Sequence, residues 1–237
     1  MKYASATYVE ETRIGFVFLR THTWQHHVLR VAINDLKRLA GESVPQGGTL
    51  LDVGCGQGRS FRYLRDVFAP SRMLGLDADP HSIDLSREET AREGIDVELF
   101  ASDCARIDLP DASVDTVFCH QTFHHLVEQE RALDEFWRVL KPGGLLLFAE
   151  STKAYIDSWV IRWFFRHPMH VQKTADQYVA MLRARGFVFT DAQVSLPYLW
   201  WSRAKDFGLL ERWGIKAAPP VGKREETLVN VAARKPD

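Results

Sequence analysis

Three carboxylates in the first half of this 237-residue chain lie within or just after short apolar runs, and each could contact a bound nucleotide. Asp52 precedes a glycine-rich turn, Asp77 ends the run that begins at Met73, and Asp103 follows the run from Val97 to Ala101. An ionised carboxylate can accept two hydrogen bonds, for example from the 2′- and 3′-hydroxyls of a ribose. In open parallel sheets, an acid about twenty residues after the turn contacts the ribose. The spacing therefore predicts a nucleotide site in which Asp77 binds the ribose.

The turn after Asp52 has glycine at alternate positions, Gly54, Gly56 and Gly58, between an apolar run and a helical pattern that begins at Arg59. Glycine allows backbone angles that are closed to other residues, and it lets a ligand lie against bare backbone at a helix N-terminus. A plain glycine-rich turn and a dinucleotide fold are the alternatives. The dinucleotide fingerprint places glycine where this chain has Arg59, which disfavours that fold.

The apolar patterns predict strands that alternate with helices. Strands are expected at 49–53, 73–76, 97–101, 114–119, 145–149, 188–195 and 228–233. Helices are expected at 14–39, 59–68, 80–93, 128–140, 155–164 and 174–185. Asp79, directly before Pro80, fits the cap of the helix 80–93, so Asp77 is left for a ligand.

A further motif, R-V-L-K-P-G-G at residues 138–144, follows these acids and ends a helix in a sharp reversal before a strand. In their order, the glycine turn, the acids and this motif resemble the class I S-adenosylmethionine-dependent methyltransferases. The resemblance is to the small-molecule group, methyltransferase type 11, which is similar to the ubiquinone/menaquinone and sterol methyltransferases. It covers about residues 50–150.

The resemblance implies an α/β, Rossmann-like fold with a seven-stranded, mostly parallel sheet, helices on both faces and an antiparallel last strand. It implies S-adenosyl-L-methionine as cofactor and S-adenosyl-L-homocysteine as product. Asp103 would accept a hydrogen bond from the adenine amino group, and the small Ala78 would lie against the adenine face. The residues expected at the cofactor are Asp52, Gly54, Gly56, Asp77, Ala78, Asp103, Cys104 and His120.

Histidines follow the fourth predicted strand, beside the expected methyl group. A hydroxyl or enol acceptor must lose a proton during transfer, and histidine is a suitable base near neutral pH. His124 and His125 are therefore the catalytic candidates, with packing against the methionine end of the cofactor as the alternative, while His120 is expected at the cofactor's amino-acid moiety. Reserve candidates are His22, His26 and His27. His22 and His26 could share a helix face, but without an H-E-x-x-H motif or a nearby carboxylate no metal is expected.

Residues 1–48 are expected to form an N-terminal helical cap on a methyltransferase domain at 49–237, with substrate-cap insertions at about 151–173 and 196–220. These insertions are rich in large aromatics, namely Trp159, Trp163, Phe164, Phe165, Tyr198, Trp200 and Trp201. They predict an apolar acceptor such as a polyketide, quinone, sterol or lipid, methylated at oxygen or carbon, or contact with a lipid surface. Packing against the sheet or against a second subunit in a homodimer is the alternative.

Composition narrows the partners. A net charge of -1 and a pI of about 6.8 disfavour nucleic acid, although methylation of protein or RNA and a non-catalytic nucleotide-binding scaffold remain alternatives. Cys55, Cys104 and Cys119 lack zinc spacing and are expected to be free thiols in a reducing compartment. The polar N-terminus does not resemble a signal peptide. We therefore expect a soluble, cytoplasmic protein.

Overall fold

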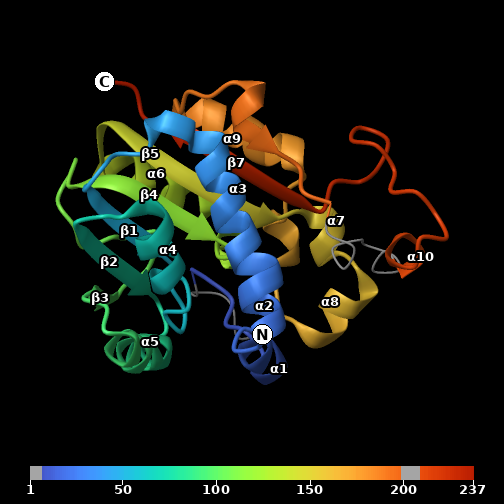
Figure 1. Ribbon diagram of the computed structural model, residues 1–237, viewed down its shortest axis with the longest axis horizontal. Helices are drawn as coiled ribbons and strands as arrows, with labels where there is room; N and C mark the ends of the chain where they lie inside the picture. Colours follow the sequence, from blue (N-terminus) through green and yellow to red (C-terminus); the bar gives the residue numbers. More distant parts are fainter. Residues whose placement is uncertain (1–6, 199–208) are drawn as a thin grey trace.

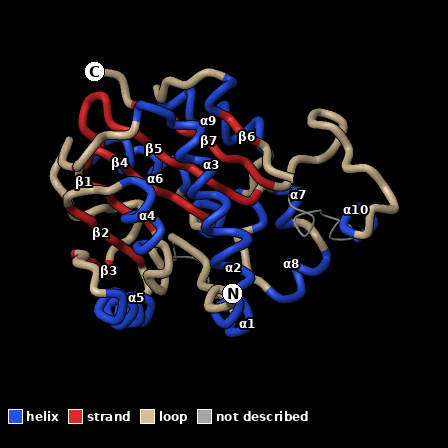
Figure 2. The backbone as a smooth tube through the Cα atoms, viewed as in Figure 1, coloured by secondary structure: helices blue, strands red, loops and turns tan. Residues whose placement is uncertain are grey.

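The computed structural model describes residues 7–198 and 209–237, and its centre is one seven-stranded sheet (Figures 1 and 2). The strand order is β3-β2-β1-β4-β5-β7-β6, and β7 runs antiparallel to both of its neighbours. This confirms the predicted fold class, including the antiparallel last strand. The strands are β1 (Thr49–Val53), β2 (Arg72–Asp77), β3 (Glu98–Ala101), β4 (Val114–His120), β5 (Leu140–Ser151), β6 (Val194–Ser195) and β7 (Leu228–Arg234).

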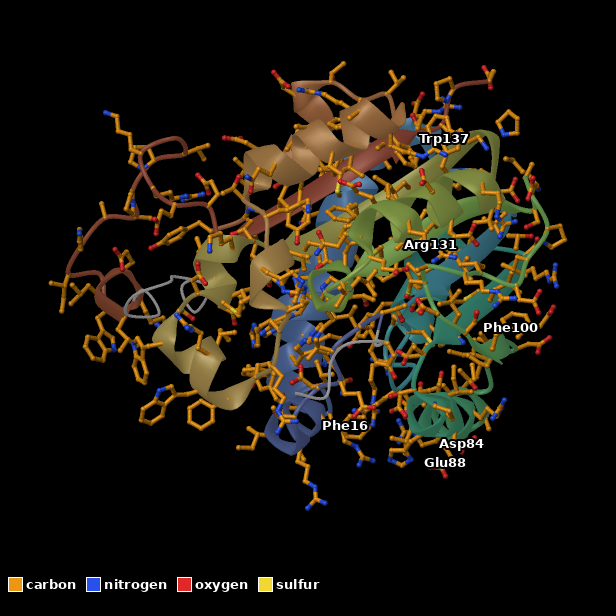
Figure 3. The ribbon with its side chains drawn as sticks, turned by 180° about the vertical axis from the view of Figure 1, so that it is seen from behind. Phe16, Asp84, Glu88, Phe100, Arg131 and Trp137 are labelled. Carbon is orange, nitrogen blue, oxygen red and sulfur yellow. The ribbon has the colours of Figure 1, made fainter. Side chains whose placement is uncertain are left out.

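Helices cover both faces of the sheet. The helices α3 (Arg30–Ala40), α4 (Phe61–Phe68) and α5 (Pro80–Glu93) pack on one face, and α3 and α4 lie in front of the sheet in Figure 1. The helices α6 (Gln129–Val139) and α9 (Ala175–Arg185) pack on the other face, and Figure 3 shows this side with Arg131 and Trp137 on α6. Apolar side chains along the strands point alternately into the two cores. This alternation fixes the register and therefore the place where each strand ends.

Local signals in the sequence set the ends of α5. Asp79 accepts hydrogen bonds from the backbone N–H groups of His81 and Ser82, both at 3.1 Å, and Pro80 occupies the first helical position. Gly94 ends the helix in the left-handed region at φ +62°. The predicted bounds and the predicted cap of α5 are therefore confirmed. Strand β2 ends at Asp77, and Asp79 already caps the helix.

Three predicted elements are divided or shortened, and the strand expected at 145–149 is longer: β5 runs from Leu140 to Ser151 and includes the predicted turn residues Lys141 to Gly144. The single helix expected at 14–39 is instead α1 (Arg13–Phe18), α2 (His22–Trp24), a π-helical turn (Gln25–Leu29) and α3, because the Thr21 hydroxyl accepts from the N–H of Trp24 and starts a new helix. The helix at 155–164 is divided into α7 (Lys153–Ile156) and α8 (Trp159–Phe164), with Ser158 as a cap. The strand at 188–195 is reduced to β6, since a short 3₁₀ turn occupies residues 191–193.

Further observations concern the segment after β6, the cysteines and the length of the helices. A short helix, α10 (Leu209–Arg212), follows the segment 199–208, and the predicted aromatics Trp200 and Trp201 lie outside the described residues. The three cysteines are free and buried, as expected. Within the described ranges, every helix is too short or too polar to cross a bilayer.

Candidate functional site

A pocket of about 260 Å³ lies at the carboxyl ends of β1, β2 and β3. The glycine turn after β1, the residues after β2 and the residues after β3 all contribute to its wall. Six of the residues predicted for the cofactor line it together: Gly54, Gly56, Asp77, Ala78, Asp103 and Cys104. The strand ends therefore converge on one concave surface, as the sequence pattern requires for a nucleotide.

The glycine turn and Asp77 form one hydrogen-bonded unit. The Asp77 carboxylate accepts from the N–H groups of Gly56 and Asp79, each at 2.9 Å. Gly54 and Gly56 have φ of +72° and +53°, so both need the left-handed region. A Cβ on Gly54 would overlap the side chain of Thr122, whereas one on Gly56 would meet no atom and would project into open space. Burial raises the pKa of Asp77, because it removes water from the charged carboxylate. Hydroxyl donors of a bound ligand would stabilise the charged form.

Two residues that were predicted for the cofactor lie outside the lining of this pocket. Asp52 is buried beneath the turn, where it accepts a hydrogen bond from the Ser60 hydroxyl, and burial raises its pKa to about 7. His120 is buried on the α3 side of β4, with its ring 5.9 Å from that of Phe118 and 5.7 Å from that of Trp24. Side chains two apart on a strand share a face, which explains why Phe118 and His120 point the same way. Contact of Asp52 and His120 with the cofactor stays a prediction.

The N-terminal segment closes over the same pocket. The Val9 N–H donates to the carbonyl of His125 at 3.0 Å, and the Val127 N–H donates to the carbonyl of Thr7 at 2.8 Å, so this segment pairs with the chain after β4. The Thr7 hydroxyl donates to Asp103. Phe16 stacks on His81 at the start of α5 with ring centroids 5.7 Å apart, and Figure 3 shows Phe16 on the N-terminal segment. Nothing in the local sequence pattern identified these lining residues, which are brought to the pocket by long-range pairing.

A second, mostly apolar cavity of about 100 Å³ adjoins the first pocket. The two share Glu11, Leu19, Gln121 and His125 in their linings. The polar part of its lining consists of Glu11, Gln121, His124, His125, Ser151, Tyr155 and His167. The apolar lining consists of Phe18, Leu19, Trp24, Val28, Ile156, Ile161, Phe165 and Leu228.

Glu150, at the carboxyl end of β5, organises the polar side of this cavity. One carboxylate oxygen accepts from the backbone N–H groups of Thr122 and Phe123, each at 2.8 Å. The other lies 2.6 Å from Nδ1 of His124, and both side chains are buried. A carboxylate can only accept, so we assign the proton to Nδ1, which leaves Nε2 of His124 with a lone pair. Glu150 thereby fixes both the loop after β4 and the tautomer of His124.

His125 and His167 complete a cluster around His124. The ring centroids lie 4.4 Å apart for His124 and His125, 4.7 Å for His125 and His167, and 5.1 Å for His124 and His167. Burial, with a smaller contribution from neighbouring histidines, lowers the pKa of His125 and of His167 well below the usual range. Glu11 lies with one oxygen 3.7 Å from Nε2 of His125, and burial raises its pKa. His125 and His167 are therefore neutral near pH 7.

Both predicted catalytic histidines thus lie in the second cavity, whereas the reserve candidates do not. The rings of His22 and His26 stack with centroids 3.8 Å apart, which confirms that they share a face. Neither of them, nor His27, lines either pocket. The polar residues that sequence reasoning missed are Glu11, Glu150, Tyr155 and His167; of these, Glu150 carries the same signal as Asp77, an acid where a strand ends.

Residues 51–148 match the family model of a methyltransferase domain. This range contains the glycine turn, Asp77, Asp103 and both catalytic candidates. Together with the strand order and the first pocket, the match shows that residues 51–148 carry a methyltransferase domain, similar to the S-adenosylmethionine-dependent methyltransferases that the sequence motifs resemble.

Curated relatives of known name belong to the same class. The demethylmenaquinone methyltransferase of Deinococcus radiodurans is 31% identical over 120 residues, which cover 50% of this chain and 50% of that protein. The fatty-acid O-methyltransferase of Mycolicibacterium smegmatis is 30% identical over 131 residues, which cover 55% of this chain and 47% of that protein. The chain therefore spans about half the length of the curated relatives it matches.

Solved structures share the fold over nearly the whole chain. A methyltransferase from Aquifex aeolicus matches with a TM-score of 0.62 at 22% identity, over 93% of this chain and 97% of that one. A [4+2]-cyclase matches with a TM-score of 0.65 at 23% identity, over 90% of this chain and 83% of that one. Since a cyclase shares the architecture, the reaction must be argued from the site rather than from the fold.

Proposed function

We propose that this chain transfers a methyl group from S-adenosyl-L-methionine to an oxygen or carbon of an apolar small molecule. The observation that carries the proposal is the junction of the two pockets. A pocket with an acid at two strand ends shares four lining residues with an apolar cavity lined by one buried and two partly buried histidines. This arrangement can hold a nucleotide and an apolar acceptor side by side.

The residues of the first pocket fit the cofactor. Asp77 would bind the ribose hydroxyls, Ala78 and Cys104 would contact the adenine, and Asp103 would accept from its amino group. The bare backbone of Gly54 and Gly56 would let the ligand approach closely, because a Cβ on Gly56 would project into open space. Bound S-adenosyl-L-methionine supplies a methyl group that its sulfonium already activates. The main task of the protein is then to align the acceptor and exclude water, which can contribute roughly 7–11 kcal/mol.

His124 is the residue best placed to accept a proton from the acceptor. Glu150 holds its Nδ1 proton at 2.6 Å, so the lone pair of Nε2 is available, and a base held in one tautomer by a carboxylate is a common arrangement in catalysis. His125, which lines both pockets, is the second candidate.

Two features support an apolar acceptor. The second cavity is lined mainly by aliphatic and aromatic side chains. The names of the relatives point to lipid-like acceptors, since they include a demethylmenaquinone, a fatty-acid and a 2-methyl-6-phytyl-1,4-hydroquinone methyltransferase. In this proposal, residues 1–48 form a cap on the domain at 49–237, and the insertions at 151–173 and 196–220 complete the acceptor site.

An exposed apolar face beside the cavity supports contact with a lipid surface. Trp159 and Trp163 on α8 are 58% and 79% exposed, and α1 contributes the exposed Ile14 and Val17. The Thr12 hydroxyl donates to the carbonyl of Phe164 at 2.6 Å, which joins the two helices. Sedimentation with anionic lipid vesicles tests this contact, and Trp163→Ser should weaken it; assembly of the chain into homodimers through this face, seen by light scattering without lipid, would contradict it.

Thermal unfolding with S-adenosyl-L-homocysteine tests the cofactor site. At about 100 times its dissociation constant the ligand should stabilise the chain by about 2.7 kcal/mol, which at this size raises the midpoint by roughly 5–11 °C. Asp77→Asn should greatly reduce the shift relative to its own midpoint. Asp84→Asn is the matched control, because Asp84 lies on α5 outside both pockets (Figure 3).

The same experiment can reject the proposal. A midpoint unmoved by S-adenosyl-L-homocysteine would contradict it, and a shift with NAD instead would restore the dinucleotide reading. Once binding is established, methyl transfer to a panel of quinols, hydroxylated fatty acids and sterols would identify the acceptor. Product on protein or RNA alone would favour the alternative substrates, and binding without any product would favour a nucleotide-binding scaffold.

A further inference from the structure

We propose that His124, His125 and His167 bind one divalent transition-metal ion such as Zn²⁺ in the wall of the second cavity. No metal was expected from the sequence, because His22 and His26 lack an H-E-x-x-H motif and a nearby carboxylate, and His167 is far from His124 and His125 in the chain. The fold brings the three side chains together: His124 and His125 follow β4, and His167 lies in the segment between α8 and α9.

The spacing of the ligand atoms is close to what an ion requires. One ring nitrogen from each histidine lies within 4.8 Å of the others, and no other group of this kind occurs among the described residues. Histidine nitrogens bind Zn²⁺ at about 2.0–2.1 Å, so tetrahedral ligands lie roughly 3.4 Å apart. The cluster must therefore contract by at most about 1.4 Å, which side-chain rotation can supply.

Glu150 provides the outer support that metal-binding histidines normally have. Its carboxylate receives the Nδ1 proton of His124 at 2.6 Å and is itself held by the N–H groups of Thr122 and Phe123. A carboxylate in this position fixes the ring orientation and raises the basicity of the other nitrogen. Nε2 of His124 is thus prepared to coordinate.

The charges around the cluster also favour a cation. Glu11 and Glu150 are both buried or largely buried, and within residues 7–198 and 209–237 their ion-pair partners are the histidines alone. Two carboxyl groups beside the cluster, in a site of low polarity, attract a cation.

The donor set selects the kind of ion. Three imidazoles suit Zn²⁺, Fe²⁺, Ni²⁺ or Cu²⁺, whereas Mg²⁺ prefers oxygen ligands and retained waters. His124, His125, His167 and Glu11 all line the second cavity. An ion there could bind an acceptor hydroxyl and lower its pKa, in place of His124 as the base. This consequence for the acceptor rests on the proposed function, whereas binding of the ion does not.

Metal content and affinity test the site directly. The full chain is stripped with a chelator, freed of the chelator and titrated with Zn²⁺ in competition with a chromophoric indicator. We expect one ion per chain, no competition from Mg²⁺, and weakening of at least tenfold in His167→Ala. Glu150→Gln should weaken binding by about 10–100-fold through the orientation of His124. His26→Ala is the matched control, since it removes one ring of a stacked histidine pair outside the cavity.

The outcomes are distinct from those for the proposed function. Wild-type protein that fails to bind stoichiometric Zn²⁺ overturns the site, whatever the variants do, as does affinity lost in His26→Ala but kept in His167→Ala. Circular dichroism checks that each variant is folded, and His167→Gln replaces His167→Ala where it is not. Zn²⁺ binding without a shift by S-adenosyl-L-homocysteine would sink only the proposed function, and a shift without Zn²⁺ binding would sink only the metal site.

Discussion

Removal of Glu150 should destabilise the chain far more than removal of any exposed acid. The Glu150 carboxylate is fully buried and accepts from three N–H donors, the backbone groups of Thr122 and Phe123 and Nδ1 of His124; the Cys119 thiol also donates to it at 3.6 Å. Glu150→Ala leaves all three without an acceptor in a place that water does not reach. Each unsatisfied buried donor costs about 1–3 kcal/mol, and the costs are not fully additive, so a total of about 3–6 kcal/mol is expected.

For a chain of this size each kcal/mol lowers the unfolding midpoint by about 2–4 °C. Glu150→Ala should therefore unfold at least about 6 °C below the wild type in a calorimetric scan. The control is Glu98→Ala, which removes a half-exposed acid paired with Arg72 at the surface. Its unfolding midpoint should stay close to that of the wild type, because exposed ion pairs contribute little to stability. A Glu150→Ala midpoint equal to that of Glu98→Ala would refute the hydrogen-bond reasoning.

Glu150→Gln separates orientation from stability. Its amide oxygen can still accept from Thr122 and Phe123, whereas its NH₂ group faces Nδ1 of His124 and requires that nitrogen to accept. The imidazole proton of His124 then moves to Nε2. A protonated Nε2 can serve neither as a base nor as a metal ligand. We expect a loss of only about 1–2 kcal/mol in stability and a changed tautomer of His124, read from imidazole ¹⁵N shifts of the metal-free chain. Wild-type ¹⁵N shifts in this variant would contradict the assigned tautomer.

Two further predictions concern Gly54, in the turn after β1, and Asp52, near the end of β1. Gly54→Ala should destabilise by roughly 2–5 kcal/mol, because it adds left-handed strain and overlap with Thr122, whereas Gly94→Ala at φ +62° adds strain alone and should lose roughly 1–2 kcal/mol. Equal losses in denaturant titrations would show that the overlap is unimportant. Asp52 has a folded pKa raised by burial to about 7, above the unfolded value, so between about pH 4 and pH 7 the folded chain holds a proton that the unfolded chain releases, and stability falls as pH rises. Relative to Asp52→Asn, the wild type should lose up to about 4 kcal/mol across this window, and a difference that is constant with pH would contradict the raised pKa.

The sheet and the first pocket could be predicted because the sequence signals that specify them are local. A buried strand, the turn that follows it and the cap of the next helix lie within a few residues of one another, as in the stretch from Met73 to Gly94. The parallel order then brings the ends of β2 and β3 together, so Asp77 and Asp103 could be placed in one pocket before any contact was known. Local pattern and global topology agree over this region.

The second cavity was predictable only in part because its wall is built from contacts across the chain. Tyr155 and His167 line it because the short helices around them pack against the cavity. The bounds of these helices could not be predicted fully from repeats or capping patterns in the sequence. Glu11 is placed by the pairing of Val9 with His125, more than a hundred residues away. Glu150 is the exception, since an acid at the end of β5 carries the same signal that identified Asp77.

The division between the two pockets explains why the family match leaves the acceptor open. Most strand-end residues of the first pocket lie within residues 51–148, the range that the methyltransferase family model covers. In the second cavity only Gln121, His124 and His125 lie within it, and the remaining lining comes from residues outside the match. Under the proposed function, the acceptor would therefore be chosen by parts of this chain that its curated relatives need not share. Substitutions on those parts, such as Ile161→Ala or Phe165→Ala, should change which acceptor is methylated without changing the affinity for S-adenosyl-L-homocysteine.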